Sequence, residues 1–495
     1  MSMPAERVHP AMTLAELLRG IADAPEIPVY DIHSDSRKLQ AGDVFLACQG
    51  ISSHGIDYVD TAIAAGAAAI VYDASTAAAP EFVPGIPIIA VDNLGKHLGT
   101  IANRFFASPS ASMRVIGITG TNGKTTVAWL IAQCMQRLGE SCAYIGTLGA
   151  GIGTVDLNAS MTTPATIELN SQLAGFRDAG ATFAALEVSS HALAQNRVDG
   201  VAFDTVMFTN LGRDHLDYHG DMQSYGDAKA RLFSEYSAKQ RIINLDSEFG
   251  TRLADRCGQD VVTVSTKFDR VANGRPYVFV RAVVANALGS QVKVVSSWGE
   301  ATMALPLVGD FNVANAVMVL ALLLTQGVPM QQACAVLGDV TAPPGRMQRV
   351  PAAASAPTVY VDFAHTPDAL DVVLRALRTH CRGKLWCVFG CGGDRDTGKR
   401  PLMGRIVEHR ADRVVISSDN PRSENPAKII AAIVAGLQRP AAAVVIEDRA
   451  TAIAWTIAQA SADDVVLIAG KGHENNQSDL ALASANLALR PVATQ

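Results

Sequence analysis

Short apolar runs alternate with helical patterns along most of the chain. Up to about residue 110, β-type runs such as 43–47 and 68–72 stand between alanine-rich helical stretches, which predicts a small α/β domain. Further strands are predicted at 113–118, 182–188, 205–208 and 241–244. Because strands that alternate with helices form mainly parallel sheets, the middle of the chain predicts such a sheet.

The alternation restarts in the last third of the chain. Residues 261–308 are rich in Val, Thr and Ser, which predicts a β insertion or an edge of the middle sheet. Beyond them, strands are predicted at 358–363, 385–389, 414–417, 444–447 and 465–469. With helical patterns between them, these strands predict a second, doubly wound α/β unit.

Two breaks divide the chain. A Ser/Pro stretch at 108–112 has the character of a linker, and consecutive prolines at 343–344 end any preceding helix. A length of 495 residues, at about 150 residues per domain, favours roughly three domains. We therefore expect domains at 1–110, 111–342 and 343–495.

Composition excludes several classes of protein. A hydrophobic share of 49% and a charged share of 18% exclude a disordered chain. A net charge of -6 gives no global attraction to nucleic acid or to an anionic membrane. The 8 cysteines are scattered without metal-ligand spacing, and the most apolar run, 316–324, falls below the roughly 18 residues that span a bilayer. We expect a soluble, cytoplasmic protein with reduced thiols and no leader peptide, without nucleic-acid or membrane partners.

A glycine-rich segment follows the predicted strand at 113–118 and opens a helix. It reads GITGTNGKTT from Gly117 to Thr126. The strict GxxxxGK[ST] pattern fails, because its first glycine would fall at Ile118, yet the context suits nucleotide phosphates. Glycines let backbone N–H groups approach phosphate oxygens, a lysine reaches the terminal phosphates and a threonine hydroxyl ligates Mg²⁺. A nucleoside triphosphate site is indicated, with a structural turn as the alternative.

Polar residues also follow two further predicted strands. Glu187 comes where a buried strand gives way to a loop, a position that suits a metal ligand or a helix cap. The segment 208–219, FTNLGRDHLDYH, holds His215 and follows another strand; by itself it could be a turn with satisfied polar groups. Lys229 lies in a helical pattern and by itself predicts a lysine on the helix surface.

Other polar segments each have a simple structural alternative. Hydroxyl and guanidinium groups near 160–164 and 189–197 suit phosphate or carboxylate, residues 34–36 could be a polar turn, and Asn312 could be a helix N-cap. In the last domain, DNPR at 419–422 contains the turn signal Asn-Pro. Arg422 could be a solvated loop residue, although its planar guanidinium is also well suited to bidentate capture of a carboxylate.

Together these motifs resemble the Mur ligase superfamily, ATP-dependent amide-forming enzymes that include folylpolyglutamate synthases. The resemblance rests on GTNGKTT, TNLGRDHLDYHG, GDFNVAN and DNPR, which occur in order over essentially the whole chain. It implies a three-domain α/β architecture: a small N-terminal UDP-binding domain, a central P-loop ATPase-like parallel sheet that binds ATP and Mg²⁺, and a C-terminal Rossmann-like domain for the incoming amino acid.

The resemblance also implies site residues. For ATP these are Gly120, Thr121, Asn122, Gly123, Lys124, Thr125, Thr126, Asn312, Arg346 and Asp362. For Mg²⁺ they are Thr125, Glu187, His215 and Lys229, the last carbamylated by CO₂ to N6-carboxylysine; Lys124, His215 and Lys229 are the catalytic group. For the UDP-linked substrate they are Ser34, Ser36, Thr162, Thr163, Ser189, Gln195 and Arg197.

DNPR is typical of the branch of the family that adds meso-2,6-diaminopimelate to UDP-N-acetylmuramoyl-L-alanyl-D-glutamate. For diaminopimelate the resemblance implies Arg395, Asp419, Asn420, Pro421, Arg422, Gly470 and Glu474. We expect a monomer that forms an acyl phosphate on the D-glutamyl γ-carboxylate and then an amide. The alternatives are the lysine-adding branch, which DNPR argues against, and a nucleotide-responsive binding or scaffold protein that has kept the phosphate loop without catalysis.

Overall fold

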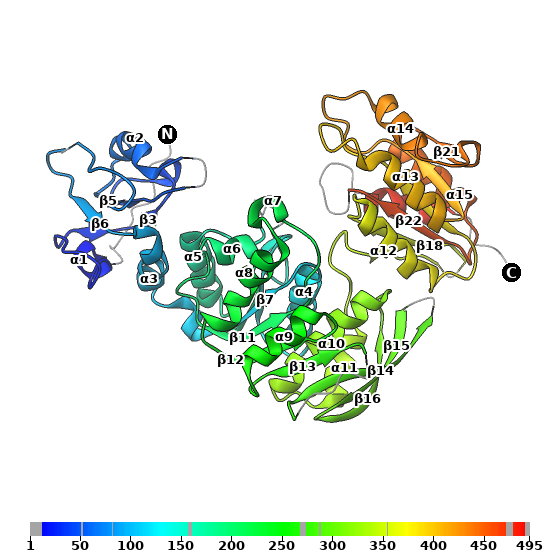
Figure 1. Cartoon of the computed structure of the whole chain (residues 1–495), viewed down its shortest axis with the longest axis horizontal. Helices are drawn as coiled ribbons and strands as arrows, with labels where there is room; N and C mark the ends of the chain where they lie inside the picture. The colour runs from blue at the N-terminus through cyan, green and yellow to red at the C-terminus, as the bar shows by residue number, and fades with distance from the viewer. Residues whose placement is uncertain are drawn as a thin grey trace. The chain divides into compact units, whose positions relative to one another are not determined.

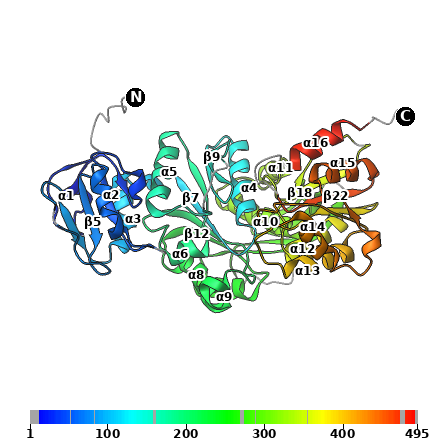
Figure 2. The ribbon, with the colours of Figure 1, turned by 90° about the horizontal axis from the view of Figure 1, so that it is seen from above.

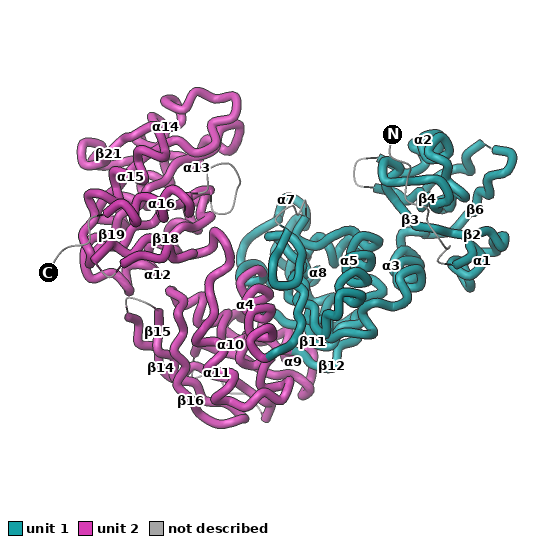
Figure 3. The backbone as a smooth tube through the Cα atoms, turned by 180° about the vertical axis from the view of Figure 1, so that it is seen from behind, with its two compact units in different colours: residues 1–124, 139–241 teal, residues 125–138, 242–495 magenta. Residues whose placement is uncertain are grey.

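The computed structural model describes residues 12–50, 53–81, 83–156, 161–267, 274–286, 289–353, 355–471 and 479–490. Contacts divide the chain into two compact units, residues 1–124 with 139–241 and residues 125–138 with 242–495 (Figure 3). Each unit is described by itself. The domain limits expected at 110 and 342 stay a prediction.

The first unit begins with a small four-stranded parallel sheet. Its strands, in the order β3-β4-β5-β6, are β3 (Ile32–His33), β4 (Val44–Ala47), β5 (Ala69–Asp73) and β6 (Ile88–Val91). Successive side chains of a strand point to opposite faces. Phe45 of β4 therefore packs in one apolar cluster with helix α2, and Leu46 packs in another with helix α3. Both helices lie next to the strands of this sheet in Figure 2. The remaining elements are β1 (Met12–Thr13), α1 (Leu14–Leu17), β2 (Pro28–Val29), α2 (Val59–Ala64) and α3 (Leu94–Phe105).

The central sheet has ten strands in the order β16-β15-β14-β13-β12-β11-β7-β10-β8-β9. Strands β7 and β11 to β16 are labelled in Figure 1. Strand β7 pairs in parallel with β10 and β11, so the chain leaves all three strands at one edge. The elements of this part are β7 (Arg114–Thr119), α4 (Lys124–Arg137), β8 (Cys142–Gly146), β9 (Gly149–Ile152), α5 (Thr166–Asp178), β10 (Phe183–Glu187), α6 (Ser190–Ala194), β11 (Phe203–Phe208), α7 (Leu216–His219), α8 (Met222–Ser234) and β12 (Ala238–Asn244).

The β-rich segment after residue 261 forms one edge of this sheet, as its composition predicts. Strands β14, β15 and β16 pair antiparallel and end the sheet. The elements are α9 (Glu248–Cys257), β13 (Val262–Ser265), β14 (Tyr277–Asn286), β15 (Gly289–Ser296), β16 (Gly299–Leu305), α10 (Asp310–Thr325) and α11 (Met330–Gly338). The apolar run 316–324 is fully within α10 and buried in the protein core.

The C-terminal sheet is doubly wound, as predicted. Its order is β17-β18-β22-β19-β20-β21, parallel except for β17. One apolar cluster joins it to α12, α13 and α14, and a second, separate cluster joins it to α15 and α16. The elements are β17 (Gln348–Arg349), β18 (Thr358–Asp362), α12 (Pro367–Arg378), β19 (Leu385–Phe389), α13 (Lys399–Arg410), β20 (Arg413–Ile416), α14 (Pro426–Val434), β21 (Val444–Val445), α15 (Arg449–Gln459), β22 (Val465–Ala469) and α16 (Asp479–Ala488).

Two features expected from composition can be compared with the structure. All eight cysteines are free thiols. Among the helices in the described ranges, none has the length and apolar character needed to cross a bilayer.

Candidate functional site

The glycine-rich loop joins β7 to α4, as predicted. Gly120 and Gly123 have φ of 144° and 87°, a region of backbone conformation that favours glycine. A Cβ atom on Gly120 would lie 2.0 Å from the Thr209 hydroxyl oxygen. Gly120 is therefore required by backbone conformation and by close packing, and Gly123 is required by backbone conformation. Thr125 and Thr126 follow in the first turn of α4.

The segment after β11 holds this loop in place. The Thr121 N–H donates to the Asn210 carbonyl at 2.9 Å, and the Asn122 N–H donates to Asn210 Oδ1 at 3.0 Å. Thr209 Oγ1 donates to the Asn122 carbonyl at 2.6 Å. Thr209 and Asn210 thus shape the loop, a role that their place in the sequence, some 88 residues away, does not reveal.

Two lysines meet at the carbonyl of Gly120. Lys124 Nζ and Lys229 Nζ each donate to this oxygen at 2.9 Å. Lys229 lies on α8 and is 1% exposed, and its Nζ is 4.3 Å from the ring centroid of Tyr225. Burial, followed by the positive charge of Lys124, lowers the pKa of Lys229 to about 6. The interpretation of Lys229 as a helix-surface lysine is wrong, because its helix turns this side chain into the core.

Glu187 ends β10 and is fully buried. Its Oε1 accepts a hydrogen bond from the Tyr144 hydroxyl at 2.6 Å and from the Thr147 N–H at 2.9 Å, and Oε2 accepts from the Thr147 hydroxyl at 3.2 Å. The following helix, α6, is capped by Ser189. Glu187 is therefore no helix cap, and a carboxylate fixed by three donors at a strand end is suited to a charged ligand.

His215 lies in a cluster of aromatic side chains. Its backbone is left-handed, with φ of 51°, and it precedes α7. The His191 ring centroid lies 4.7 Å from that of His215 and 4.2 Å from that of Tyr218, and His219 Nε2 is 3.0 Å from the Ser190 hydroxyl. Burial, followed by the neighbouring histidines, lowers the pKa of His191. Tyr218 lies within the quoted motif TNLGRDHLDYHG and His191 lies in the polar segment 189–197, but no spacing rule selects either residue.

Four of the residues predicted for the UDP-linked substrate are linked by hydrogen bonds to the backbone of Glu187. Thr163 Oγ1 donates to the Glu187 carbonyl at 2.7 Å and accepts from the Ser189 N–H at 3.0 Å. The guanidinium of Arg197 donates to Gln195 Oε1 at 2.6 and 3.0 Å and to the Thr163 carbonyl at 2.9 Å. Burial lowers the pKa of Arg197. These residues form one hydrogen-bonded group that is attached to the main-chain carbonyl of Glu187.

Three further residues are predicted for the same substrate. The Thr162 hydroxyl is 3.1 Å from that of Thr147, which joins it to Glu187. Ser34 and Ser36 follow the carboxyl end of β3 in the small N-terminal sheet; Ser34 is exposed and Ser36 is buried. Gln195 Nε2 also donates to the Tyr218 hydroxyl at 3.1 Å, so Tyr218 links the substrate group to the histidines.

The other residues predicted for ATP lie in the second unit. Asn312 is buried in the first turn of α10, whose N-cap is Gly309, so its interpretation as an N-cap is wrong. The Asp362 carboxylate accepts N–H bonds from Met347 and Ala364 at 2.7 and 2.8 Å. Burial raises the pKa of Asp362, and the two donors oppose that shift. Asp362 thereby fixes the segment that carries Arg346, which lies over the Phe363 ring at 5.0 Å.

Three segments that carry the residues predicted for diaminopimelate meet in the C-terminal sheet. Arg422 has φ of 50°, and its Nη1 donates to the Gly393 carbonyl at 2.6 Å. The Gly393 N–H donates to the Asn420 carbonyl at 2.8 Å. A Cβ on Gly470 would lie 2.7 Å from Asp419 Oδ2. Pro421 continues the same loop and Arg395 lies exposed beyond Gly393, whereas Glu474 lies outside the described residues.

The donor atoms at the carboxyl edge of the central sheet fit Mg²⁺ in part. Mg²⁺ prefers oxygen ligands, which the Glu187 carboxylate and the Thr125 hydroxyl can offer. His215 offers nitrogen, a less usual ligand for Mg²⁺, and the Lys229 amine becomes an oxygen donor only as a carbamate. In the described ranges no group of three His, Cys, Asp or Glu side chains could hold a metal ion; the predicted set contains only two residues of those types.

The phosphate loop between a central parallel strand and a helix defines a nucleotide-binding α/β protein. Comparison with known proteins is more specific. Residues 28–106 match the model "Mur ligase family, catalytic domain", residues 118–323 match "Mur ligase middle domain" and residues 345–472 match "Mur ligase, glutamate ligase domain". The chain belongs to the Mur ligase family.

Individual relatives match over nearly the whole chain. A protein of Coxiella burnetii (strain RSA 493 / Nine Mile phase I) is 44% identical over 92% of this chain and 92% of its own length. One of Haemophilus influenzae (strain PittGG) is 41% identical over 91% of this chain and 93% of its own length. Both are named "UDP-N-acetylmuramoyl-L-alanyl-D-glutamate--2,6-diaminopimelate ligase".

Solved structures agree with the family. A structure of a ligase with that same name has a TM-score of 0.75 and 33% identity, and covers 96% of this chain and 99% of its own. A MurF ligase of Thermotoga maritima in complex with ADP has a TM-score of 0.61 and 17% identity, over 92% of this chain and 96% of its own. The second likeness shows the shared fold alone. The three-domain α/β architecture implied by the sequence motifs is thus confirmed.

Proposed function

We propose that the chain is an ATP-dependent amide ligase that joins meso-2,6-diaminopimelate to the D-glutamyl γ-carboxylate of UDP-N-acetylmuramoyl-L-alanyl-D-glutamate. The observation that carries the proposal is the identity of 41% and 44% with curated ligases of that name over more than nine tenths of the chain. The DNPR segment supports it, because Arg422 lies at the carboxyl edge of the C-terminal sheet, where open α/β sheets bind ligands.

The central part of the chain is proposed to transfer the ATP γ-phosphate to the substrate carboxylate. Lys124 follows the phosphate loop, and its Nζ donates to the carbonyls of Gly120 and Thr121 at 2.9 Å. When ATP binds, this side chain would turn to the phosphates. Mg²⁺ would supply positive charge that offsets the repulsion between the substrate carboxylate and the triphosphate. Its proposed ligands are Thr125, Glu187, His215 and carbamylated Lys229. Arg346, carried on a segment fixed by Asp362, would stabilise charge on the transferred group.

The amino acid is proposed to react with the acyl phosphate in a second step. The UDP-linked substrate would be held by Thr162, Thr163, Ser189, Gln195 and Arg197. Its uridine end would contact Ser34 and Ser36. Diaminopimelate would be held by the residues that the DNPR resemblance implies, here called the selector residues: Arg395, Asp419, Asn420, Pro421, Arg422, Gly470 and Glu474. Its free amine attacks the acyl carbon and inorganic phosphate leaves. Holding both reactants in one orientation removes much of the entropic barrier.

One assay tests the proposal against both alternatives. Phosphate release is measured with ATP, Mg²⁺ and the UDP-muramoyl dipeptide, with diaminopimelate, with lysine or with no amino acid. We expect release that depends on diaminopimelate, together with a product whose mass equals both substrates less one water. Dependence on lysine instead would identify the lysine-adding branch. ATP binding without turnover would identify a binding protein, and turnover that needs no amino acid would contradict the ligase.

The proposal extends to the compartment and the assembly of the protein. A cytoplasmic location is supported by the eight free cysteines, since reducing compartments keep thiols free, and by the need for ATP. A monomer without a membrane partner stays the expectation, tested by sedimentation of the purified chain.

A glycine beside Glu187 gives a test of the proposed metal site that changes no ligand. A Cβ on Gly146 would lie 2.1 Å from Glu187 Oε1, so Gly146→Ala must displace the carboxylate. We expect the Mg²⁺ concentration for half-maximal phosphate release to rise about tenfold, in the range found for altered outer contacts of metal ligands. Gly175→Ala is the matched control, because nothing lies within 4 Å of its Cβ. An unchanged Mg²⁺ dependence in Gly146→Ala would remove Glu187 from the metal site.

A further inference from the structure

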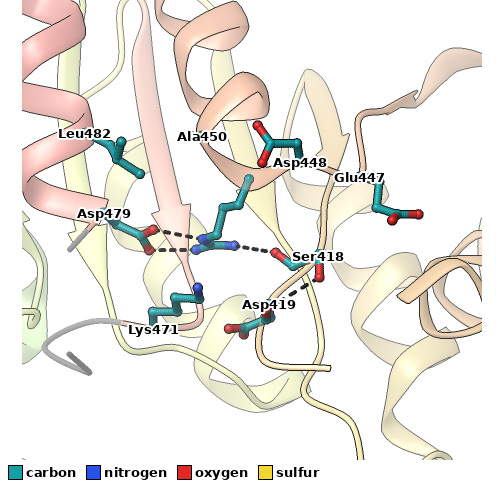
Figure 4. Close-up of a pocket in the computed structure, with 9 residues that line it drawn as sticks. Ser418, Asp419, Glu447, Asp448, Ala450, Lys471, Asp479 and Leu482 are labelled. Carbon is teal, nitrogen blue, oxygen red and sulfur yellow. Dashed lines mark hydrogen bonds and ion pairs between the residues drawn. The ribbon is translucent and has the colours of Figure 1, made fainter. Parts of the chain in front are cut away.

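A cavity of about 360 Å³ lies at the carboxyl edge of the C-terminal sheet (Figure 4). Its lining includes Ser418 and Asp419, which follow β20, Lys471, which follows β22, and Asp479, the first residue of α16. Figure 4 shows Ser418 and Asp479 on opposite sides of one guanidinium group. The cavity therefore adjoins two of the segments that carry the proposed selector residues.

The guanidinium belongs to Arg449, the first residue of α15. Arg449 is 7% exposed and Asp479 is 1% exposed. Nε donates to Oδ1 of Asp479 at 2.8 Å, and Nη2 donates to Oδ2 at 2.7 Å. This paired geometry satisfies the buried carboxylate, and it fixes the orientation of the planar guanidinium relative to both helix starts.

The remaining donors of Arg449 point to the two selector segments. Nη2 donates to the Ala469 carbonyl at 2.9 Å, directly before Gly470. Nη1 makes a longer contact of 3.5 Å with the Ser418 carbonyl, directly before Asp419. Because a Cβ on Gly470 would lie 2.7 Å from Asp419 Oδ2, the two segments touch, and Arg449 is bonded to the backbone of both.

A contribution to stability alone does not explain this arrangement. Apolar residues of similar volume often replace a buried ion pair without loss of stability, since both charges lose their hydration. Apolar residues cannot, however, donate to two backbone carbonyls at once. What the ion pair adds is a fixed set of donors that links β20, β22, α15 and α16.

We propose that Arg449, oriented by Asp479, is a positioning residue that sets the segments 418–422 and 469–471 in the geometry that accepts the amino acid. The inference rests on the proposed function, because it concerns the amino-acid site of that reaction. Arg449 acts through backbone carbonyls and is not itself assigned a contact with the substrate.

The test replaces the ion pair without leaving a charge buried. In the full-length chain, the double variant Arg449→Met with Asp479→Leu removes both charges and all four donor contacts, while Arg449→Lys keeps the charge but loses the fork. The control is Arg378→Met, which breaks the 2.7 Å ion pair with Asp412 at the amino edge of the same sheet. Phosphate release gives kcat and KM for diaminopimelate and for ATP. Native-state hydrogen exchange reports on residues 418–422 and 469–471.

We expect the double variant and Arg449→Lys to lose about 10²-fold in kcat/KM for diaminopimelate, mostly through KM, as misplacement by about 1 Å does elsewhere. KM for ATP should stay within about twofold, and exchange in the two segments should quicken. Arg378→Met should change neither kcat/KM for diaminopimelate nor hydrogen exchange in the two segments. Wild-type KM and exchange in a folded variant would overturn the inference and leave the proposed function intact. If the double variant fails to fold, Arg449→Lys decides by the same two measurements. A wild-type protein without diaminopimelate-dependent turnover would overturn the proposed function instead, and this inference with it.

Discussion

Lys229→Met is expected to reduce diaminopimelate-dependent phosphate release by about 10³-fold, the size of effect seen when a charge-stabilising group is removed from an active site. Lys229 is buried beside the phosphate loop, with Nζ 2.9 Å from the Gly120 carbonyl. There its amine would add CO₂ and release a proton, becoming a carbamate anion that can hold Mg²⁺. Methionine fills similar space but cannot form that anion. Steady-state rates at saturating substrates measure the effect.

The pH dependence of the same reaction follows from the environment of Lys229. Only a neutral amine adds CO₂, and burial with the nearby Lys124 charge lowers the Lys229 pKa to about 6. The neutral amine therefore predominates above pH 6 and is lost as the pH falls through 6. Protein stripped of CO₂ should regain activity when bicarbonate is added at pH 8 and much less at pH 5.5.

Isotope labelling and a matched variant complete this test. Protein equilibrated with ¹³CO₂ should show a ¹³C carbamate signal that Lys229→Met lacks. Lys239→Met is the control, since Lys239 is an exposed lysine of the same unit that pairs with Asp204. Loss of activity in Lys229→Met without a carbamate signal in the wild type would assign the lysine a role as a cation instead.

Most of the fold could be predicted because its strands are short, buried and apolar. Residues 385–389 and 465–469 are strands with the predicted limits, and both are fully buried. Strands β8 and β9 were not predicted. The apolar run of β8 is short and ends at Gly146, and β9, with the sequence GAGI, is half glycine. Their pairing supplies Tyr144 and Thr147, so a missed hairpin also meant missed partners of Glu187.

The candidate site was predictable where chemistry follows from local sequence. The phosphate loop depends on adjacent residues, and its place between β7 and α4 is confirmed. The burial of Lys229 could not be found in this way, because its hydrogen-bond partner Gly120 lies 109 positions earlier and reaches it only in the folded chain. For the same reason Arg449 and Asp479, which are 30 positions apart, give no signal in the sequence.

Arg422→Ala is expected to raise KM for diaminopimelate about 10²-fold, the size expected when hydrogen bonds to a charged group are lost. Among the described residues, the Arg422 guanidinium makes one hydrogen bond, from Nη1 to Gly393. Other donors of the fork can then bind the distal carboxylate of the substrate. KM for ATP should be unchanged. The backbone at position 422 is left-handed, a conformation that is unfavourable for both Arg and Ala. The substitution should therefore change the loop backbone little.

Kinetics with lysine as the substrate distinguish two roles of Arg422, direct recognition of diaminopimelate and support of the loop structure. Lysine lacks the distal carboxylate, so Arg422→Ala removes a contact that only diaminopimelate can make. The ratio of kcat/KM for diaminopimelate to that for lysine should therefore fall by the same factor of about 10². A loop that has simply lost its shape would impair both amino acids alike and leave the ratio unchanged, which would contradict the assignment. Arg439→Ala, at an exposed arginine of the same domain, should leave both values at the wild-type level.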